Sequence, residues 1–185
     1  MVVALKNEDR ILVGISICDS VIDMSENDLS LTENVTFWKV RGTKDCYVFV
    51  DGECISSDVL HYNDYIFKDI TDCKSIITKV VPRMKKLLNQ YSRVLKEESW
   101  ERELLIVKRD KMFAINNYFI VREIEKSHAC GKSKYLLGGL EESRDENPEE
   151  NILFAVRNFC RMKNVNLFPL TMFDTKTKKK KVYYK

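Results

Sequence analysis

Strand-length apolar runs separated by short polar turns fill much of the first 50 residues. Residues 2–5 and 11–17 flank one charged turn, and residues 35–40 and 46–50 flank another. Runs rich in β-branched and aromatic residues on either side of a polar turn are typical of β-hairpins. The pattern therefore predicts two hairpins, and the acidic passage between them, residues 19–34, is predicted to be a solvated or partner-facing loop.

Apolar residues then recur at three- and four-residue spacing, which is typical of amphipathic helices. One helix is predicted from a serine cap, Ser56 or Ser57, to about residue 67. A second is predicted from its cap Asp72 to about residue 96. Pro82 lies inside that second pattern, and because proline lacks the N–H that a helix needs, we expect a kink or a break near Val81.

Residues 129–163 carry the strongest helical signals. Asn147 suits an N-cap and Pro148 suits the first helical position, where the missing N–H costs nothing. The helix that starts there has an apolar stripe made of Ile152, Ala155, Val156 and Phe159. A preceding helical face contains small residues that let a neighbour approach closely. This face consists of Tyr135, Leu136, Gly138, Gly139 and Leu140.

Strand-like runs return on both sides of this helix pair. Residues 103–108, 112–116 and 118–124 predict a meander before it, and residues 166–174 and 181–184 predict a closing hairpin after it. Two antiparallel sheets packed face to face, with a helix pair on each outer side, would bury every apolar helix stripe. We therefore predict an α+β fold, a four-layer α/β/β/α sandwich, in one domain spanning residues 1–185.

The predicted core follows from these layers, because a sandwich with outer helices buries one face of each strand and helix. The apolar positions with a consistent period are Leu12, Ile15, Val48, Val50, Ile106, Phe113, Ile120, Leu137, Leu140, Ile152, Val156 and Phe159.

Composition narrows the classes of function. The chain is 44% hydrophobic and 32% charged, and its net charge of +3 is too small to indicate nucleic-acid binding. Apolar runs stay shorter than the ~20 residues that span a bilayer, and the amino terminus enters a strand without a signal-peptide pattern. We therefore expect a cytoplasmic protein that does not bind membranes. The basic run Lys178, Lys179, Lys180 and Lys181 is predicted to be a solvated turn, with a basic binding module as the alternative.

Cysteine and histidine spacing predicts neither a metal site nor a cofactor. The cysteines Cys18, Cys46, Cys54, Cys73, Cys130 and Cys160 form no C-x-x-C pair, and the histidines His61 and His128 lie far apart. Reduced, buried cysteine is the expected role of these thiols. His128 and Cys130 stand two residues apart, so on a strand both side chains would share one face and could form a hydrogen-bonded pair.

Several segments resemble proteasome β-type subunits and the bacterial HslV protease, members of the N-terminal-nucleophile hydrolases. That family shows a G-S-G-x-x-Y-A-L-G-A-L helix start and a P-E-E helix, and here Gly131-Lys132-Ser133, then Tyr135 to Leu140, and Pro148-Glu149-Glu150 correspond. The opening Val2-Val3-Ala4-Leu5-Lys6 is similar to the family's first strand, and Lys39-Val40-Arg41 is similar to the K-V-R that carries its catalytic lysine. The resemblance implies the four-layer fold and a homo-oligomer, as in the family's rings.

The resemblance also shows how far the catalytic positions have changed. Family members use a first-residue hydroxyl as nucleophile and its own α-amine as base. Without gaps, Met1 falls on the family's second residue, which leaves the nucleophilic threonine without a counterpart. The other corresponding positions are Ser16 or, with a slip, Asp19 for the aspartate, Lys39 for the lysine, and Lys132 or Ser133 for the serine.

These changes predict a catalytically inactive protein that acts by self-assembly or by binding a protein partner. The alternative is an amidohydrolase or peptidase with a displaced nucleophile. Cys18, near the end of the second strand, and Cys130, beside His128, are the candidates for that nucleophile.

Overall fold

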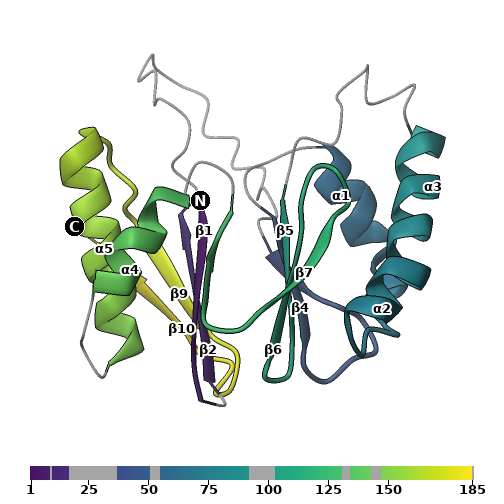
Figure 1. Cartoon of the computed structure of the whole chain (residues 1–185), viewed down its shortest axis with the longest axis horizontal. Helices are drawn as coiled ribbons and strands as arrows, with labels where there is room; N and C mark the ends of the chain where they lie inside the picture. The colour runs from purple at the N-terminus through teal and green to yellow at the C-terminus, as the bar shows by residue number, and fades with distance from the viewer. Residues whose placement is uncertain are drawn as a thin grey trace.

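The computed structural model describes residues 1–8, 10–16, 37–50, 55–91, 103–130, 134–142 and 147–184. Within these ranges the chain forms two five-stranded antiparallel sheets with helices on both outer sides. Figure 1 shows the two sheets facing each other, with α4 and α5 covering one and α1, α2 and α3 covering the other. The predicted four-layer α/β/β/α sandwich is therefore confirmed.

The first sheet has the strand order β10-β9-β2-β1-β8. Its strands are β1 (Val2–Asn7), β2 (Arg10–Ser16), β8 (Ser127–Ala129), β9 (Leu170–Asp174) and β10 (Lys180–Tyr183). The opening hairpin pairs Val2 with Ile15 and Asn7 with Arg10, and the closing hairpin joins the same sheet through β9 against β2. The predicted opening and closing hairpins are therefore both confirmed. β8 was not predicted, because its three residues are too few to form a recognisable period.

The second sheet is a meander with the order β3-β4-β5-β6-β7. Its strands are β3 (Phe37–Lys39), β4 (Cys46–Val50), β5 (Leu104–Lys108), β6 (Lys111–Ile115) and β7 (Val121–Ile124). The last strand starts later than predicted because the Asn116 side chain accepts hydrogen bonds from the N–H groups of Tyr118 and Ile120. Ile120 lies in this turn and is 55% exposed, so its predicted place in the core is wrong.

Helices of the second sheet's outer layer follow the sequence signals with one difference, at the start of the first helix. They are α1 (Ile55–Tyr62), the 3₁₀ helix η1 (Asp64–Phe67), α2 (Cys73–Ser75), the π-helix η2 (Ile76–Val80) and α3 (Val81–Tyr91). Asp72 caps α2 in a capping box with Ser75, as predicted. Ser56 and Ser57 are not caps, because α1 already begins at Ile55 and both serines are buried inside it.

Pro82 changes the helix at the predicted place. The turn before it widens into η2, where the N–H of Val81 bonds to the carbonyl of Ile76, five residues back. Proline has no N–H to give to the carbonyl four residues earlier, and the wider π-turn lies directly before the position where that bond is missing. The helix then continues as α3 to Tyr91. The predicted continuation to about residue 96 lies outside the described residues.

The first sheet is covered by α4 (Leu136–Glu142) and α5 (Pro148–Lys163). Asn147 caps α5 by accepting a hydrogen bond from the N–H of Glu149, and Asn164 ends it in a left-handed conformation. A Cβ at Gly139 would stand 3.2 Å from the Cα of Ala155. The missing side chain therefore lets α4 pack closely on α5, as the sequence predicted.

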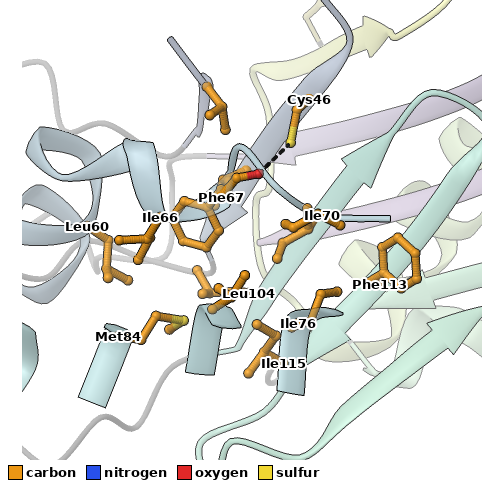
Figure 2. Close-up of a cluster of buried hydrophobic side chains, with 14 of the residues drawn as sticks. Cys46, Leu60, Ile66, Phe67, Ile70, Ile76, Met84, Leu104, Phe113 and Ile115 are labelled. Atoms are coloured by element: carbon orange, nitrogen blue, oxygen red, sulfur yellow. Dashed lines mark hydrogen bonds between the residues drawn. The ribbon is translucent and has the colours of Figure 1, made fainter. Parts of the chain in front are cut away.

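Three apolar clusters separate the four layers. One lies between α4, α5 and the first sheet, one between the sheets, and one between the second sheet and its helices. Figure 2 shows the third, which contains Leu104 and Phe113 and in which the Cys46 thiol donates to the Phe67 carbonyl (3.9 Å). Of the predicted core, nine residues are buried. Leu137 and Phe159 are half-buried against the cluster between α4, α5 and the first sheet. The nine are Leu12, Ile15, Val48, Val50, Ile106, Phe113, Leu140, Ile152 and Val156.

Within the described part of the chain, helices lack the combination of length and apolar content that crossing a membrane requires.

Candidate functional site

The amino-terminal residue of the described chain is built into the first sheet. The α-amine of Met1 donates to the carbonyl oxygen of Ser16 at 2.9 Å, and the N–H of Ser16 donates to the carbonyl of Met1 at 3.0 Å. The Met1 side chain is 3% exposed and belongs to the apolar cluster under α4 and α5. Met1 therefore extends the β1–β2 hairpin, and its amine serves as a donor in the sheet.

Ser16 and Lys39 do not form a charged pair beside that amine. Ser16 is 1% exposed, and its hydroxyl has no hydrogen-bond partner among the described residues. Lys39 lies on the edge strand β3 opposite Tyr47, with an exposed side chain and no ion pair to any described residue. The neighbouring Arg41 instead bonds to the buried carboxylate of Asp64 (3.0 Å). The lysine that the resemblance pointed to is thus present in sequence but not gathered into a site.

Four further candidate positions, Cys18, Asp19, Lys132 and Ser133, lie outside the described residues.

A different group of side chains does meet, at the same end of the first sheet. One ligand-type atom from each of Glu103, His128 and Cys130 lies within 4.8 Å of the others, and all three residues are buried. The Nε2 atom of His128 stands 3.4 Å from Oε1 of Glu103. The N–H of Cys130 donates to the carbonyl of Val2 at 3.0 Å, which places this group beside the second residue of the chain. We call these three residues the Glu103–His128–Cys130 cluster.

Strand geometry explains how the cluster forms. Ala129 faces the helix-side apolar cluster, so the residues before and after it, His128 and Cys130, face the space between the sheets. Glu103 precedes β5 of the opposite sheet and reaches across that space. The predicted sharing of one face by His128 and Cys130 is confirmed. Glu103 was not predicted, because no short-range sequence pattern connects the residue before β5 to a strand that starts 24 residues later.

Two basic side chains lie next to the Glu103 carboxylate. Lys134 Nζ lies 3.7 Å from Oε2 of Glu103, and Arg122 Nη2 lies 4.0 Å from Oε1. Both basic side chains are more than half exposed, whereas the Glu103 side chain is 6% exposed. The two cations therefore approach the buried carboxylate from the solvent side. The cluster therefore offers a carboxylate, an imidazole and a thiol, which are the groups of a thiol nucleophile with its base or of a metal site.

Another buried thiol lacks such an environment. Burial raises the pKa of the Cys46 thiol to about 11, an effect larger than the opposing charge of Lys108. Only a small fraction of the Cys46 thiol would be ionised at neutral pH, and the thiolate is the reactive form. Cys46 is therefore an inert core residue, and it provides a natural comparison for Cys130.

The basic run near the carboxyl terminus is largely engaged within the chain. Lys178 pairs with Asp45 (3.2 Å), Lys181 pairs with Glu149 (2.6 Å), and the Lys180 ammonium lies 4.5 Å from the centre of the Phe37 ring. Lys180 and Lys181 belong to β10, so the prediction that all four lysines form a turn is wrong for these two. The reason is that the turn is completed early by Asp174, whose carboxylate accepts from the N–H groups of Lys176 and Thr177.

Solved structures share this architecture over nearly the whole chain. BPH from Thiobacillus denitrificans, in complex with epoxomicin, matches with a TM-score of 0.70 at 18% identity, covering 94% of this chain and 96% of that one. HslV from Trypanosoma brucei matches with a TM-score of 0.60 at 10% identity, over 94% and 97%. The chain has a proteasome-like, HslV-type fold. Anbu from Pseudomonas aeruginosa, solved as a helical assembly, matches with a TM-score of 0.64 at 14% identity, over 99% and 80%.

Sequence comparison adds nothing to this structural likeness, since neither a protein-family model nor a curated protein matches the chain. Within the HslV-type fold of this chain, Met1 and the Glu103–His128–Cys130 cluster lie at one end of the first sheet. The lysine on β3 is not joined to either by a described contact.

Proposed function

We propose that this chain is a proteasome-like protein without N-terminal threonine-peptidase activity, which acts by assembling with copies of itself or by binding a protein partner. The bonding of Met1 carries this proposal. An N-terminal nucleophile needs a hydroxyl or thiol on its side chain and an amine free to accept that group's proton. Here the side chain is an aliphatic thioether packed under α4 and α5, and the amine donates to Ser16.

Exposed apolar side chains on both helix layers support self-assembly. Phe154 and Met162 on α5 are 47% and 71% exposed, and Tyr62 and Ile77 on the opposite layer are 76% and 53% exposed. Phe154 and Met162 are eight residues apart, which places them about two turns apart near the same side of α5, and apolar groups that share one side of an outer helix are typical of protein contact sites. The Pseudomonas relative in fold forms a helical assembly, and a second copy of this chain is the partner that we propose for these layers.

Native mass spectrometry and sedimentation at micromolar concentration test the assembly. We expect a particle heavier than the 21.7 kDa chain. Phe154→Asp with Met162→Asp should shift it toward the monomer, because two buried carboxylates at a contact would lack partners. The matched control is Tyr118→Asp, which changes a 75% exposed residue in the β6–β7 turn and should leave the mass unchanged. A wild-type monomer would remove self-assembly from the proposal and leave partner binding.

Peptide hydrolysis assays test the proposed inactivity. The wild-type chain and a variant with one residue added before Met1 should both show no turnover above background. Epoxomicin, the compound bound in the BPH structure, should not form a stable adduct with either. Turnover in the wild type that the added residue abolishes would show that the α-amine takes part in catalysis, and the proposal would be wrong.

The Glu103–His128–Cys130 cluster favours a second candidate, a thiol-dependent amidohydrolase. Its sulfur, imidazole and carboxylate lie within 4.8 Å of one another, as in a nucleophile, base and orienting acid. A thiol-directed activity probe should then label Cys130 stoichiometrically in the folded chain, and His128→Gln should suppress the labelling. Since Cys130 is fully buried, we expect no such labelling, and its observation would replace the first proposal with this one.

A further inference from the structure

We propose that the Glu103–His128–Cys130 cluster binds a single divalent transition-metal ion of the zinc type. The ion would join the two sheets at the end where the chain begins, since Glu103 stands at the start of β5 and the other two residues belong to β8 and its end. The inference concerns binding only, so it holds or fails independently of assembly and of peptidase activity.

The donor set suits zinc. Thiolate sulfur, imidazole nitrogen and carboxylate oxygen are its usual protein ligands, at about 2.3, 2.0–2.1 and 2.0–2.2 Å. Two ligands about 2.1 Å from a tetrahedral centre lie about 3.4 Å apart. The Nε2 of His128 and Oε1 of Glu103 are separated by 3.4 Å, and the sulfur of Cys130 is within 4.8 Å of both. Small side-chain rotations would bring the sulfur to bonding distance and leave a fourth position for water or another ligand.

The bonding of His128 is an independent indication. Its side chain is 6% exposed, and its Nε2 is buried without a hydrogen-bond partner, although Glu103 lies 3.4 Å away. The two atoms are therefore close but not aligned along a hydrogen bond. Buried polar atoms nearly always have partners, and an exception calls for an explanation. A lone pair directed at a metal that Glu103 also binds explains both the closeness and the missing alignment.

Charge is balanced in the occupied site. The Cys130 thiol releases its proton to solvent when it binds the metal, so one thiolate and one carboxylate neutralise the two positive charges of the ion. Lys134 lies 3.7 Å from Oε2 of Glu103, the carboxylate oxygen that is not the one 3.4 Å from His128, and would orient the carboxylate from outside. Arg122 approaches Oε1 at 4.0 Å from an exposed position, from which it can move away. A neutral complex is the form that a buried space between two sheets tolerates best.

Metal titration of the purified full chain tests the proposal. After chelation and dialysis, Co²⁺ should bind at one ion per chain with a thiolate-to-metal charge-transfer band, and Zn²⁺ should displace it. X-ray absorption of the Zn²⁺ form should show one sulfur at about 2.3 Å with nitrogen or oxygen neighbours. These wild-type measurements do not depend on any variant folding. Absence of stoichiometric binding, or binding without sulfur, would overturn the proposal and leave a His128–Glu103 contact without a metal.

Variants identify the ligands. Cys130→Ser should abolish the charge-transfer band, and His128→Gln and Glu103→Gln should each weaken Zn²⁺ binding by more than about 100-fold, since even outer partners of a metal site contribute 10–100-fold. The matched control is Cys46→Ser, which changes another fully buried cysteine on a strand and should leave stoichiometry and band unchanged. Loss of the band in Cys46→Ser, or its retention in folded Cys130→Ser, would contradict the assignment.

Discussion

Asp174 illustrates how one buried side chain completes a local structure. Burial by itself would raise the pKa of its carboxyl group, but the Thr177 N–H and hydroxyl, the Lys176 N–H and the Arg10 guanidinium outweigh burial and hold that pKa below its usual value. Arg10 donates to Oδ2 at 3.0 Å, from the start of β2. The same carboxylate therefore ends β9, shapes the last turn and ties that turn to the first hairpin.

Asp174→Asn should lower the free energy of unfolding by about 1–3 kcal/mol at pH 7, because hydrogen bonds to a charged group are lost. The folded pKa lies below the unfolded value of about 3.9, so the carboxylate's stabilisation is complete above that value and is lost as the pH falls through the folded pKa. The difference between variant and wild type should thus be constant from pH 7 to about 5 and shrink below about pH 4. Urea unfolding at several pH values measures it.

The control for Asp174 is Asp69→Asn. Asp69 pairs with Arg83 at 3.7 Å, but both side chains are about half exposed. Exposed pairs contribute little, so we expect a change below about 0.5 kcal/mol. Equal losses in the two variants, or a loss in Asp174→Asn that persists at pH 2, would show that the carboxylate's charge is not what stabilises the turn.

At the scale of elements, adjacent glycines in α4 have different surroundings. A Cβ at Gly139 would meet the Cα and Cβ of Ala155 on α5 at 3.2 Å, whereas a Cβ at Gly138 would meet nothing within 4 Å. Backbone atoms of a packed helix cannot move aside as a flexible side chain can. The contact between α4 and α5, and with it the cover over the first sheet, therefore depends on Gly139 alone of this pair.

The same substitution at the two positions tests this difference. Gly139→Val should destabilise the chain by about 1–3 kcal/mol, because overpacking would push α4 away from α5. Gly138→Val should change stability by less than about 0.5 kcal/mol, since valine and glycine differ little in helix propensity and the site is open. Thermal and urea unfolding provide the measurement. Similar effects at both positions would mean that α4 and α5 are not packed as closely as described.

At the scale of the whole molecule, aromatic rings join the two sheets. Phe173 on β9 lies 5.0 Å from the Tyr47 ring and 6.3 Å from the Phe49 ring, both on β4 of the opposite sheet, and 5.5 Å from Phe37 on β3. Phe173 is 3% exposed and sits in the apolar cluster between the sheets. These contacts join residues more than 120 positions apart, so they form only when the two sheets pack against each other.

Phe173→Ala should lower the free energy of unfolding by about 3–5 kcal/mol through lost burial and the cavity left behind. A double-mutant cycle with Phe49→Ala should show a coupling of about 0.5–1.5 kcal/mol for the ring pair. Tyr118→Ala, at an exposed turn, is the control and should have almost no effect. Additive losses in the cycle would mean that the rings stabilise their own sheets without joining them.

What the sequence determined by itself was local. Apolar period, caps and turn residues predicted both flanking hairpins, the Asp72 and Asn147 helix starts and the change at Pro82, because each signal acts within a few residues. The layers followed from these elements together, because two sheets with outer helices bury every apolar stripe. The exposed Ile120 and the buried Ser56 and Ser57 departed from prediction where the Asn116 turn and an earlier helix start prevailed.

Only the tertiary structure decided which chemical groups meet. His128 and Cys130 shared a face by strand alternation alone, but Glu103 joined them because the two sheets pack face to face. Lys39 matched a catalytic pattern in sequence, yet its edge position leaves it exposed and unpaired among the described residues. Pairing between distant strands has no local signature, since it is selected by the burial of whole sheet faces and not by the residues that happen to come together.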